Sequence, residues 1–291
     1  MNETNSGPQS RRRISIFPPA DYDVRQAEML PETPQTLSPA FRLAFLDHDF
    51  LYSDDMRPVR LQLELQKFEL ILRRRGITST VVMFGGARIP APEAQGGAAT
   101  PALGELSRYY DEARRFARLV GEESVRRNHR EFVVCTGGGP GVMEAGSRGA
   151  HEAGAETIGM GIMLPHEAVP NAYVTPELSF NFHYFAIRKM HFLMRARAVA
   201  VFPGGFGTLD ELFETLTLIQ TKRMQPIPML LFGRDFWQRI VDWQALAEAG
   251  TISPEDLALF RFVKTAEEGW EILREAMGIG SRAEEQRRRQ R

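Results

Sequence analysis

Short runs rich in β-branched and aromatic residues alternate with longer stretches of helical periodicity through most of the chain. Such runs predict strands, and the stretches between them predict helices. Strands that alternate with helices indicate parallel strands joined by right-handed crossovers, so we expect an α/β fold built on a doubly wound parallel sheet. The predicted strands are 80–84, 132–136, 157–164, 198–202, 227–232 and 260–263, and the predicted helices are 104–128, 141–153, 183–197, 208–222, 234–249 and a last one that opens with a capping box of Thr265 and Glu268.

The first part of the chain differs from the rest. Residues 1–40 are rich in Pro, Ser, Gln and Arg and lack sustained apolar periodicity, which is typical of a tail or of a segment that wraps a surface. Apolar side chains then recur at helical spacing from Leu61 to Leu72 and stop before Gly76, which predicts an amphipathic helix that packs on the domain or on a partner subunit. We therefore expect an N-terminal helical and irregular extension over 1–75, an α/β domain over 76–280 and a charged tail over 281–291.

Composition narrows the class of protein. Hydrophobic residues make up 43% of the chain and charged residues 25%, which fits a globular protein and excludes collagen-like and wholly disordered chains. The formal charge of −1 offers no general attraction for nucleic acid or for an anionic membrane, so neither is an expected partner. Cys135 is the single cysteine, so no intramolecular disulfide forms. No apolar run is long enough for a membrane span and the first residues lack an apolar signal core, so we expect a cytoplasmic protein.

Three predicted strands run directly into glycine-rich turns, at 84–88, 136–141 and 202–208. In a doubly wound sheet these turns share the carboxyl edge, where ligands bind near the reversal of strand order. Glycine allows close approach of the backbone, and the helix that follows offers unpaired N–H groups to an anion. A tight strand-to-helix turn would also explain any one of the three, but their coincidence at one edge favours a phosphate site, with Arg88 and Arg188 as available cations.

The glycine patterns do not match the common nucleotide motifs. Val142 occupies the position where a dinucleotide fingerprint requires its third Gly or Ala, and no Gly-Lys-Ser/Thr follows a glycine turn. An NAD-dependent enzyme and an ATP hydrolase are therefore less favoured alternatives. Thr208 and Glu211 allow two interpretations, because Thr-Leu-Asp-Glu is a capping box for a helix that starts there and also places a carboxylate beside the phosphate, where a catalytic group would lie.

A longer pattern covers the third turn. Residues 202–211 read Phe-Pro-Gly-Gly-Phe-Gly-Thr-Leu-Asp-Glu and resemble the PGGxGTxxE signature of the LOG ("lonely guy") proteins, long mislabelled as lysine decarboxylases. Arg188 and Lys189, at their distance from Glu211, resemble the Arg-Lys pair of that family, and the first two glycine turns fit its nucleotide-binding loops. The resemblance spans about residues 78–250.

This resemblance implies a Rossmann-like fold and an N-glycosidase that needs no cofactor. The reaction it implies is hydrolysis of a nucleoside 5′-monophosphate, AMP or a cytokinin riboside monophosphate, to free base and ribose 5-phosphate by a homodimer or higher homo-oligomer. Arg188 and Glu211 are then the catalytic pair. The residues expected to bind substrate are Gly86, Arg88, Gly137, Gly138, Gly139, Glu144, Lys189, Gly204, Gly205, Gly207 and Thr208.

The residue types fit that chemistry. Breaking a ribosyl C–N bond develops positive charge on the ribose, so the Glu211 carboxylate would stabilise the transition state and orient or deprotonate water. The histidines form no cluster with metal-ligand spacing, and no metal is expected. His183, Tyr184 and His191 either line the base pocket or pack as core aromatics.

Other functions remain open at this point. Glu144 stands where plant LOG proteins carry a glycine, so the sequence does not fix the preferred base. The main alternative is a non-catalytic carrier of a nucleotide or phosphorylated cofactor, similar to the molybdenum-cofactor carriers that share the fold. Glu211 argues against that alternative, because anion binding gains nothing from a neighbouring carboxylate. A decarboxylase would need pyridoxal phosphate on Lys189, and nothing else in the sequence supports one.

Overall fold

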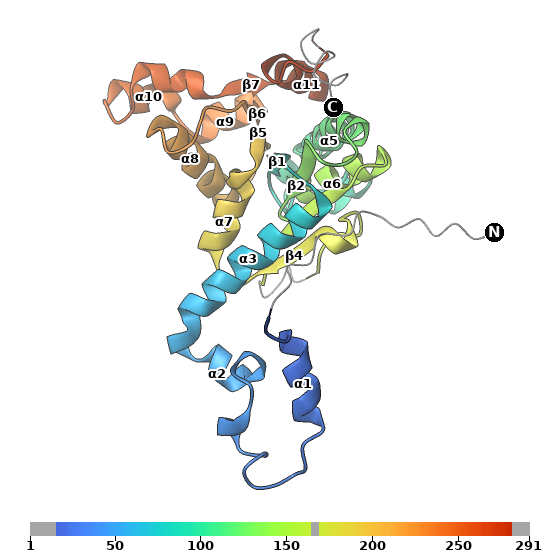
Figure 1. The fold of residues 1–291 in the computed structure, drawn as a ribbon. Coiled ribbons are helices and arrows are strands. Elements are labelled where there is room, and N and C mark those ends of the chain that lie inside the picture. The colour runs from blue at the N-terminus through green and yellow to red at the C-terminus, as the bar shows by residue number, and fades with distance from the viewer. Residues whose placement is uncertain (1–15, 164–168, 281–291) are drawn as a thin grey trace, which may run out of the picture. The chain divides into compact units, whose positions relative to one another are not determined.

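The structure, a computed structural model, describes residues 16–163 and 169–280 of the 291-residue chain. The chain divides into two compact units, one ending at Gln62 and the other starting at Leu63. The second unit contains a seven-stranded sheet in the order β4-β3-β2-β1-β5-β6-β7, with every neighbouring pair parallel (Figure 1). The predicted Rossmann-like α/β fold is therefore confirmed. The strands are β1 (Thr80–Phe84), β2 (Val133–Thr136), β3 (Thr157–Ile162), β4 (Ser179–Phe182), β5 (Ala196–Val201), β6 (Met229–Phe232) and β7 (Arg261–Val263).

The order of the strands reverses between β1 and β5. From β1 the chain moves outward through β2 and β3 to β4, then returns to place β5 on the other side of β1. Phe84 at the end of β1 is the register partner of Val201 at the end of β5. The turns after these two strands therefore touch, and the Gly86 N–H donates a hydrogen bond to the Pro203 carbonyl at 2.9 Å. This is the place in an open α/β sheet where ligands bind.

Helices cover both faces of the sheet (Figure 1). Successive side chains of β1 point to opposite faces, so Val81 and Met83 pack with α5 while Val82 and Phe84 pack with α7. α6 and α11 join α5 on the first face, and α8, α9 and α10 join α7 on the second. The helices that follow β1 in this unit are α4 (Pro101–Glu105), α5 (Arg108–Arg126), α6 (Val142–Glu152), α7 (Phe185–Met194), α8 (Phe206–Gln220), α9 (Arg234–Ile240), α10 (Trp243–Glu248) and α11 (Ala266–Ala276).

The predicted amphipathic helix is α3 (Arg57–Arg75), and it ends at Gly76, whose φ of 71° is the left-handed conformation that favours glycine at a helix terminus. Phe68 and Leu72 are buried in the core on the α7 face. The second half of α3 therefore belongs to the α/β unit, although the sequence analysis grouped it with the extension.

The N-terminal unit contains α1 (Ala20–Glu28), α2 (His48–Tyr52) and the start of α3. Within residues 16–62 no residue is buried, so this part of the unit has no hydrophobic core of its own. The predicted start of the tail, residues 1–15, and the predicted charged end, 281–291, lie outside the described residues.

Several local predictions differ from the structure. β4 was missed, because the alternation Ser-Phe-Asn-Phe is short and directly precedes a helix. The helix expected over 234–249 is two helices, since the Asp242 carboxylate accepts the Ala245 N–H at 3.0 Å and starts α10 anew. The stretch 104–128 likewise contains the end of α4 and all of α5.

The capping box expected at the start of α11 is only half present. The Thr265 hydroxyl accepts the Glu268 N–H at 3.2 Å, as expected. The Glu268 carboxylate, however, accepts from the Lys264 N–H instead of the Thr265 N–H.

We expect Gly149→Ala to destabilise the protein by about 1–3 kcal/mol, because a Cβ on Gly149 would lie 1.9 Å from the Arg114 carbonyl oxygen and would force α6 away from α5. Denaturant unfolding measures the change. Gly104→Ala in α4 is the matched control, since its Cβ would have only ordinary contacts at 3.6 Å. Equal stability of the two variants would contradict this account of α5–α6 packing.

Candidate active site

A cavity of about 1050 Å³ lies at the carboxyl edge of the sheet. All three predicted glycine turns line it, together with Arg188 and Glu211. Of the predicted substrate-binding residues, those that line the cavity are Gly86, Arg88, Gly137, Gly138, Gly139, Gly204, Gly205, Gly207 and Thr208. The fold therefore brings most of the predicted residues together around one cavity, although the first and third turns lie about 120 residues apart along the chain.

The turn after β5 presents the amino end of α8 to the cavity. A Cβ on Gly204 would lie 2.2 Å from the Thr208 hydroxyl and 2.9 Å from the Gly86 nitrogen, so only glycine fits where these turns meet. α8 begins at Phe206, with Gly205 as its N-cap and no side-chain cap. The first N–H groups of α8 therefore face the cavity without an intrahelical partner, an arrangement that binds anions.

The capping-box interpretation of Thr208 and Glu211 is wrong. Thr208 is the third residue of α8 and does not precede the helix, because the helix already starts after the glycine pair. Glu211 lies almost one turn further along and lines the cavity. Its carboxylate is consequently available for chemistry and is not folded back on the helix start.

Arg188 and Glu211 form a largely buried pair. Arg188 lies on α7, and its Nε donates a hydrogen bond of 2.7 Å to the Met160 carbonyl within β3. Its Nη1 lies 3.7 Å from Glu211 Oε1, and the two side chains are 11% and 16% exposed. The Arg188 guanidinium also lies over the Phe192 ring, 5.0 Å from its centroid. These contacts hold the guanidinium between β3 and α8.

Burial changes the acidity of Glu211. Loss of solvent raises the pKa of its carboxyl to about 7 from an ordinary value of 4.5. The positive charge of Arg188 opposes this rise, as does that of Lys189, and the negative charges of Asp210 and Glu214 add to it. A carboxyl group that titrates near neutral pH inside a cavity is typical of general acid–base catalysis.

Lys189 lies beside the site and outside the set of described residues that lines the cavity. Its Nζ is 3.0 Å from the Asp210 carboxylate and 3.1 Å from the Glu214 carboxylate. Lys189 follows Arg188 on α7, and Asp210 precedes Glu211 on α8. This ion pair therefore links the two helices next to the catalytic candidates, and its predicted contact with substrate stays a prediction.

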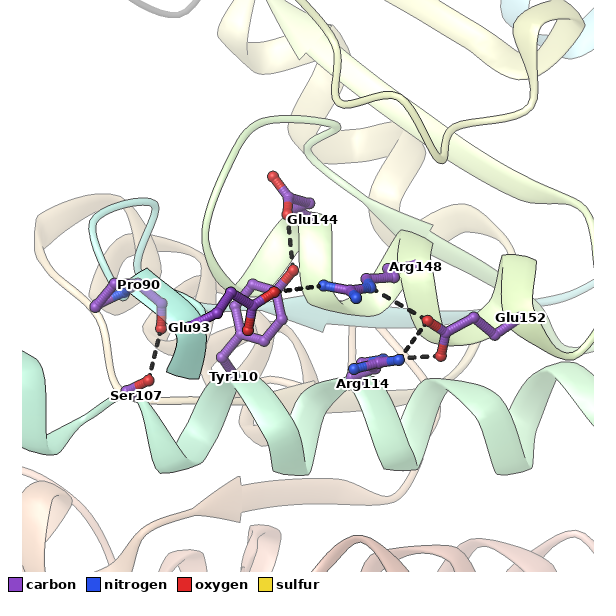
Figure 2. Close-up of polar contacts among 8 residues, drawn as sticks. All are labelled: Pro90, Glu93, Ser107, Tyr110, Arg114, Glu144, Arg148 and Glu152. Atoms are coloured by element: carbon purple, nitrogen blue, oxygen red, sulfur yellow. Dashed lines mark hydrogen bonds and ion pairs between the residues drawn. The ribbon is translucent and has the colours of Figure 1, made fainter. Parts of the chain in front are cut away.

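Glu144 also lies outside the described lining of the cavity. It is in the first turn of α6, and the Tyr110 hydroxyl of α5 donates to its Oε1 at 2.7 Å (Figure 2). Burial, followed by the hydrogen bond to Glu144, raises the pKa of Tyr110. Arg148, one turn further along α6, contacts Glu93 at 3.1 Å and Glu152 at 3.2 Å (Figure 2). Glu144 thus joins α5 to α6, and its predicted contact with substrate stays a prediction.

One positioning residue was missed by the sequence analysis. The Asn171 side-chain amide donates to the carbonyls of Gly138 and Gly139, both at 3.0 Å, and its backbone N–H donates to Gly138 at 2.8 Å. These bonds hold Val169 and Pro170 against the second glycine turn as a wall of the cavity. No motif marked Asn171, because its partners are backbone atoms more than 30 residues away.

The three aromatic candidates on and near α7 are placed as follows. His191 packs in the core, with its ring 4.3 Å from that of Phe68, and burial lowers its pKa. The backbone N–H groups of His183 and Tyr184 donate to the Glu64 carboxylate. Across residues 16–163 and 169–280, no group of three or more His, Cys, Asp and Glu side chains has an arrangement suited to a metal ion. Among the same residues no helix combines the length and the apolar character needed to cross a membrane.

Comparison with known proteins adds independent support for the resemblance. A curated relative, the pyrimidine/purine nucleotide 5′-monophosphate nucleosidase of Escherichia coli strain K12, is 30% identical over 133 residues, which cover 40% of this chain and 27% of that protein. The chain thus spans about a quarter of the length of that relative. A cytokinin riboside 5′-monophosphate phosphoribohydrolase of Arabidopsis thaliana is 28% identical over 152 residues, 51% of this chain and 68% of that protein.

Among solved structures, the molybdenum cofactor carrier protein of Chlamydomonas reinhardtii matches with a TM-score of 0.46 and 16% identity, over 69% of this chain and 99% of that one. The sequence model of the family described as "Possible lysine decarboxylase" matches residues 143–273, which include Arg188, Glu211 and the third glycine turn. Together with the named relatives, this match confirms the resemblance to the LOG proteins that the PGGxGTxxE pattern predicted.

Proposed function

We propose that this protein hydrolyses the N-glycosidic bond of a nucleoside 5′-monophosphate to release the free base and ribose 5-phosphate. The observation that carries the proposal is the buried pair of Arg188 and Glu211 beside the uncapped amino end of α8. The names of the curated relatives support the same reaction class. AMP and cytokinin riboside monophosphates are the proposed substrates, and the proposed homo-oligomer stays a prediction.

The 5′-phosphate binds at the reversal of strand order. The first N–H groups of α8 point to it, and the turn at Gly86 contributes a second backbone surface. Arg88 lines the same cavity and supplies a cation. Because the backbone amides are fixed by the fold, the phosphate is held without reorganisation and the ribose is placed next to Glu211.

Glu211 acts on the water and on the ribose. In its ionised form the carboxylate accepts a proton from the attacking water and stabilises the positive charge that develops at the anomeric carbon. The C–N bond breaks as the water oxygen bonds to that carbon, and the base departs with the glycosidic electron pair and takes up a proton. Arg188, anchored on the Met160 carbonyl, holds the ribose in line with the carboxylate.

We expect Glu211→Gln and Arg188→Ala each to lower kcat/KM for AMP by at least about 100-fold, since each removes a group that acts in the transition state. Chromatography of the released base measures the rate. Glu214→Gln, one turn further along α8, is the matched control and should stay within about threefold of the parent at pH 8.5, where Glu211 is ionised in both proteins.

Two outcomes would contradict the proposed function. One is full activity of Glu211→Gln. The other is binding of mononucleotides by the parent without release of base from any of them, which would favour the non-catalytic carrier.

The pH dependence should show the Glu211 titration. Since the ionised carboxylate is the active form and its pKa is about 7, kcat/KM should fall about tenfold per pH unit below pH 7. Lys189→Gln removes a positive charge that lowers the pKa of Glu211 and should move the fall to higher pH, whereas Asp210→Asn should move it to lower pH. The substrate phosphate also titrates, with a pKa of about 6. Its pKa would not shift in opposite directions in Lys189→Gln and Asp210→Asn.

Glu211→Gln should also stabilise the protein at alkaline pH. The folded-state pKa is raised, so the ionised carboxyl costs folding free energy that is absent below about pH 4.5 and fully present above pH 7. Removing the charge should therefore raise the free energy of unfolding by up to about 3 kcal/mol at pH 8.5, relative to the parent, and by much less at pH 5. Denaturant unfolding at the two pH values measures this, and an equal effect at both would contradict the buried charge.

A further inference from the structure

The cavity extends past the catalytic pair to the edge of the sheet. Beyond Arg188 it is lined by β3 and by the edge strand β4. Gly161 of β3 leaves space there, because a Cβ on it would meet only the Phe180 carbonyl oxygen, at 3.2 Å. Gly159 differs, since a Cβ on it would collide with Val174 at 2.8 Å. The free space at the β3–β4 end of the cavity therefore lies over Gly161.

Asn181 borders this opening. It is the register partner of Gly161, and register partners on neighbouring strands point to the same face of a sheet. Phe180 and Phe182, on either side of Asn181, point to the opposite face, where they pack against Phe68 with ring centroids 4.5 and 5.9 Å away. The Asn181 side chain is exposed and lines the cavity, and its amide has no hydrogen-bond partner among the described residues.

The positions along the sheet edge match the order of groups in a mononucleotide. Neighbouring strands lie about 4.8 Å apart, so the phosphate end at β5 and the opening at β3 are separated by three strand spacings, or about 14 Å. Arg188 and Glu211 lie between them, because Arg188 is bonded to the Met160 carbonyl of β3 and approaches Glu211 of α8. When the phosphate of a mononucleotide lies at α8 and its ribose lies at Arg188 and Glu211, its base therefore points toward Gly161 and Asn181.

We propose that Asn181 is the residue that selects the base, and that it favours adenine. A side-chain carboxamide offers a donor and an acceptor side by side, which matches the N7 acceptor and the N6 amino donor of adenine. A purine with a carbonyl at position 6, as in IMP, presents two acceptors on that edge and loses one of the two bonds. Pro170, held by the neighbouring Asn171, supplies an apolar surface for the face of the base.

The inference rests on the proposed function, which sets the orientation of the substrate in the cavity. Measurements of binding alone test it. Calorimetry on the Glu211→Gln background measures the affinities of AMP, IMP and ribose 5-phosphate without consuming any of them. The background protein should bind AMP about 10- to 100-fold more tightly than IMP, as expected for a bidentate contact to a base edge. Adding Asn181→Leu should bring the two affinities within about threefold and leave that of ribose 5-phosphate unchanged.

Two further variants sharpen the test. Gly161→Ala should weaken AMP and IMP binding alike and spare ribose 5-phosphate, because the new methyl group occupies the base position. Ser179→Ala is the matched control on the same strand. Its register partner Gly159 is already covered by Val174, so the preference for AMP should persist.

Three results would overturn the assignment of Asn181. They are equal affinity of the background protein for AMP and IMP, an unchanged preference in Asn181→Leu, and a loss of ribose 5-phosphate binding as large as the loss of AMP binding. The hydrolase proposal fails separately, if the parent releases no base. A preference for AMP that depends on Asn181 would still support the base site in that case.

Discussion

The hydrogen bond from Arg188 to the Met160 carbonyl fixes the geometry on which the site depends. It ties α7 to β3 and aims the other guanidinium nitrogens at Glu211 and the cavity. Without this anchor a long arginine side chain would be free to form a close ion pair with the carboxylate. Held at 3.7 Å, Arg188 instead leaves the Glu211 pKa dominated by burial, so the carboxyl titrates near neutral pH.

Lys189 shows how the surroundings keep that balance. Its positive charge lowers the pKa of Glu211, and the two carboxylates that hold it, Asp210 and Glu214, raise that pKa. Its charge is therefore mostly compensated locally. The same ion pairs join α7 to α8 next to the two catalytic candidates, so a single lysine both links the two helices and moderates the electrostatic field at the site.

The sheet and the candidate pair of Arg188 and Glu211 could be predicted from the sequence because both have local signals. Strands of Val, Ile and Phe that run into glycine are recognisable without tertiary information, and the PGGxGTxxE pattern is contiguous. The helix start at Phe206 was misjudged because a capping box is only a pattern of residue types, and the glycine turn supplied the cap position first. Asn171 and Asn181 were missed because what they do depends on backbone partners and register across strands, which no spacing along the chain reveals.

The contact between Tyr110 and Glu144 makes the amino ends of α6 and α8 electrostatically different. Both α6 and α8 begin at the cavity edge, and each has a positive amino end. In α6 the Glu144 carboxylate, fixed by Tyr110, already neutralises part of that positive end. The amino end of α8 carries no acidic residue in its first turn. In the proposed complex the dianionic phosphate is therefore favoured at α8, and the turn before α6 is left for the uncharged part of the nucleotide.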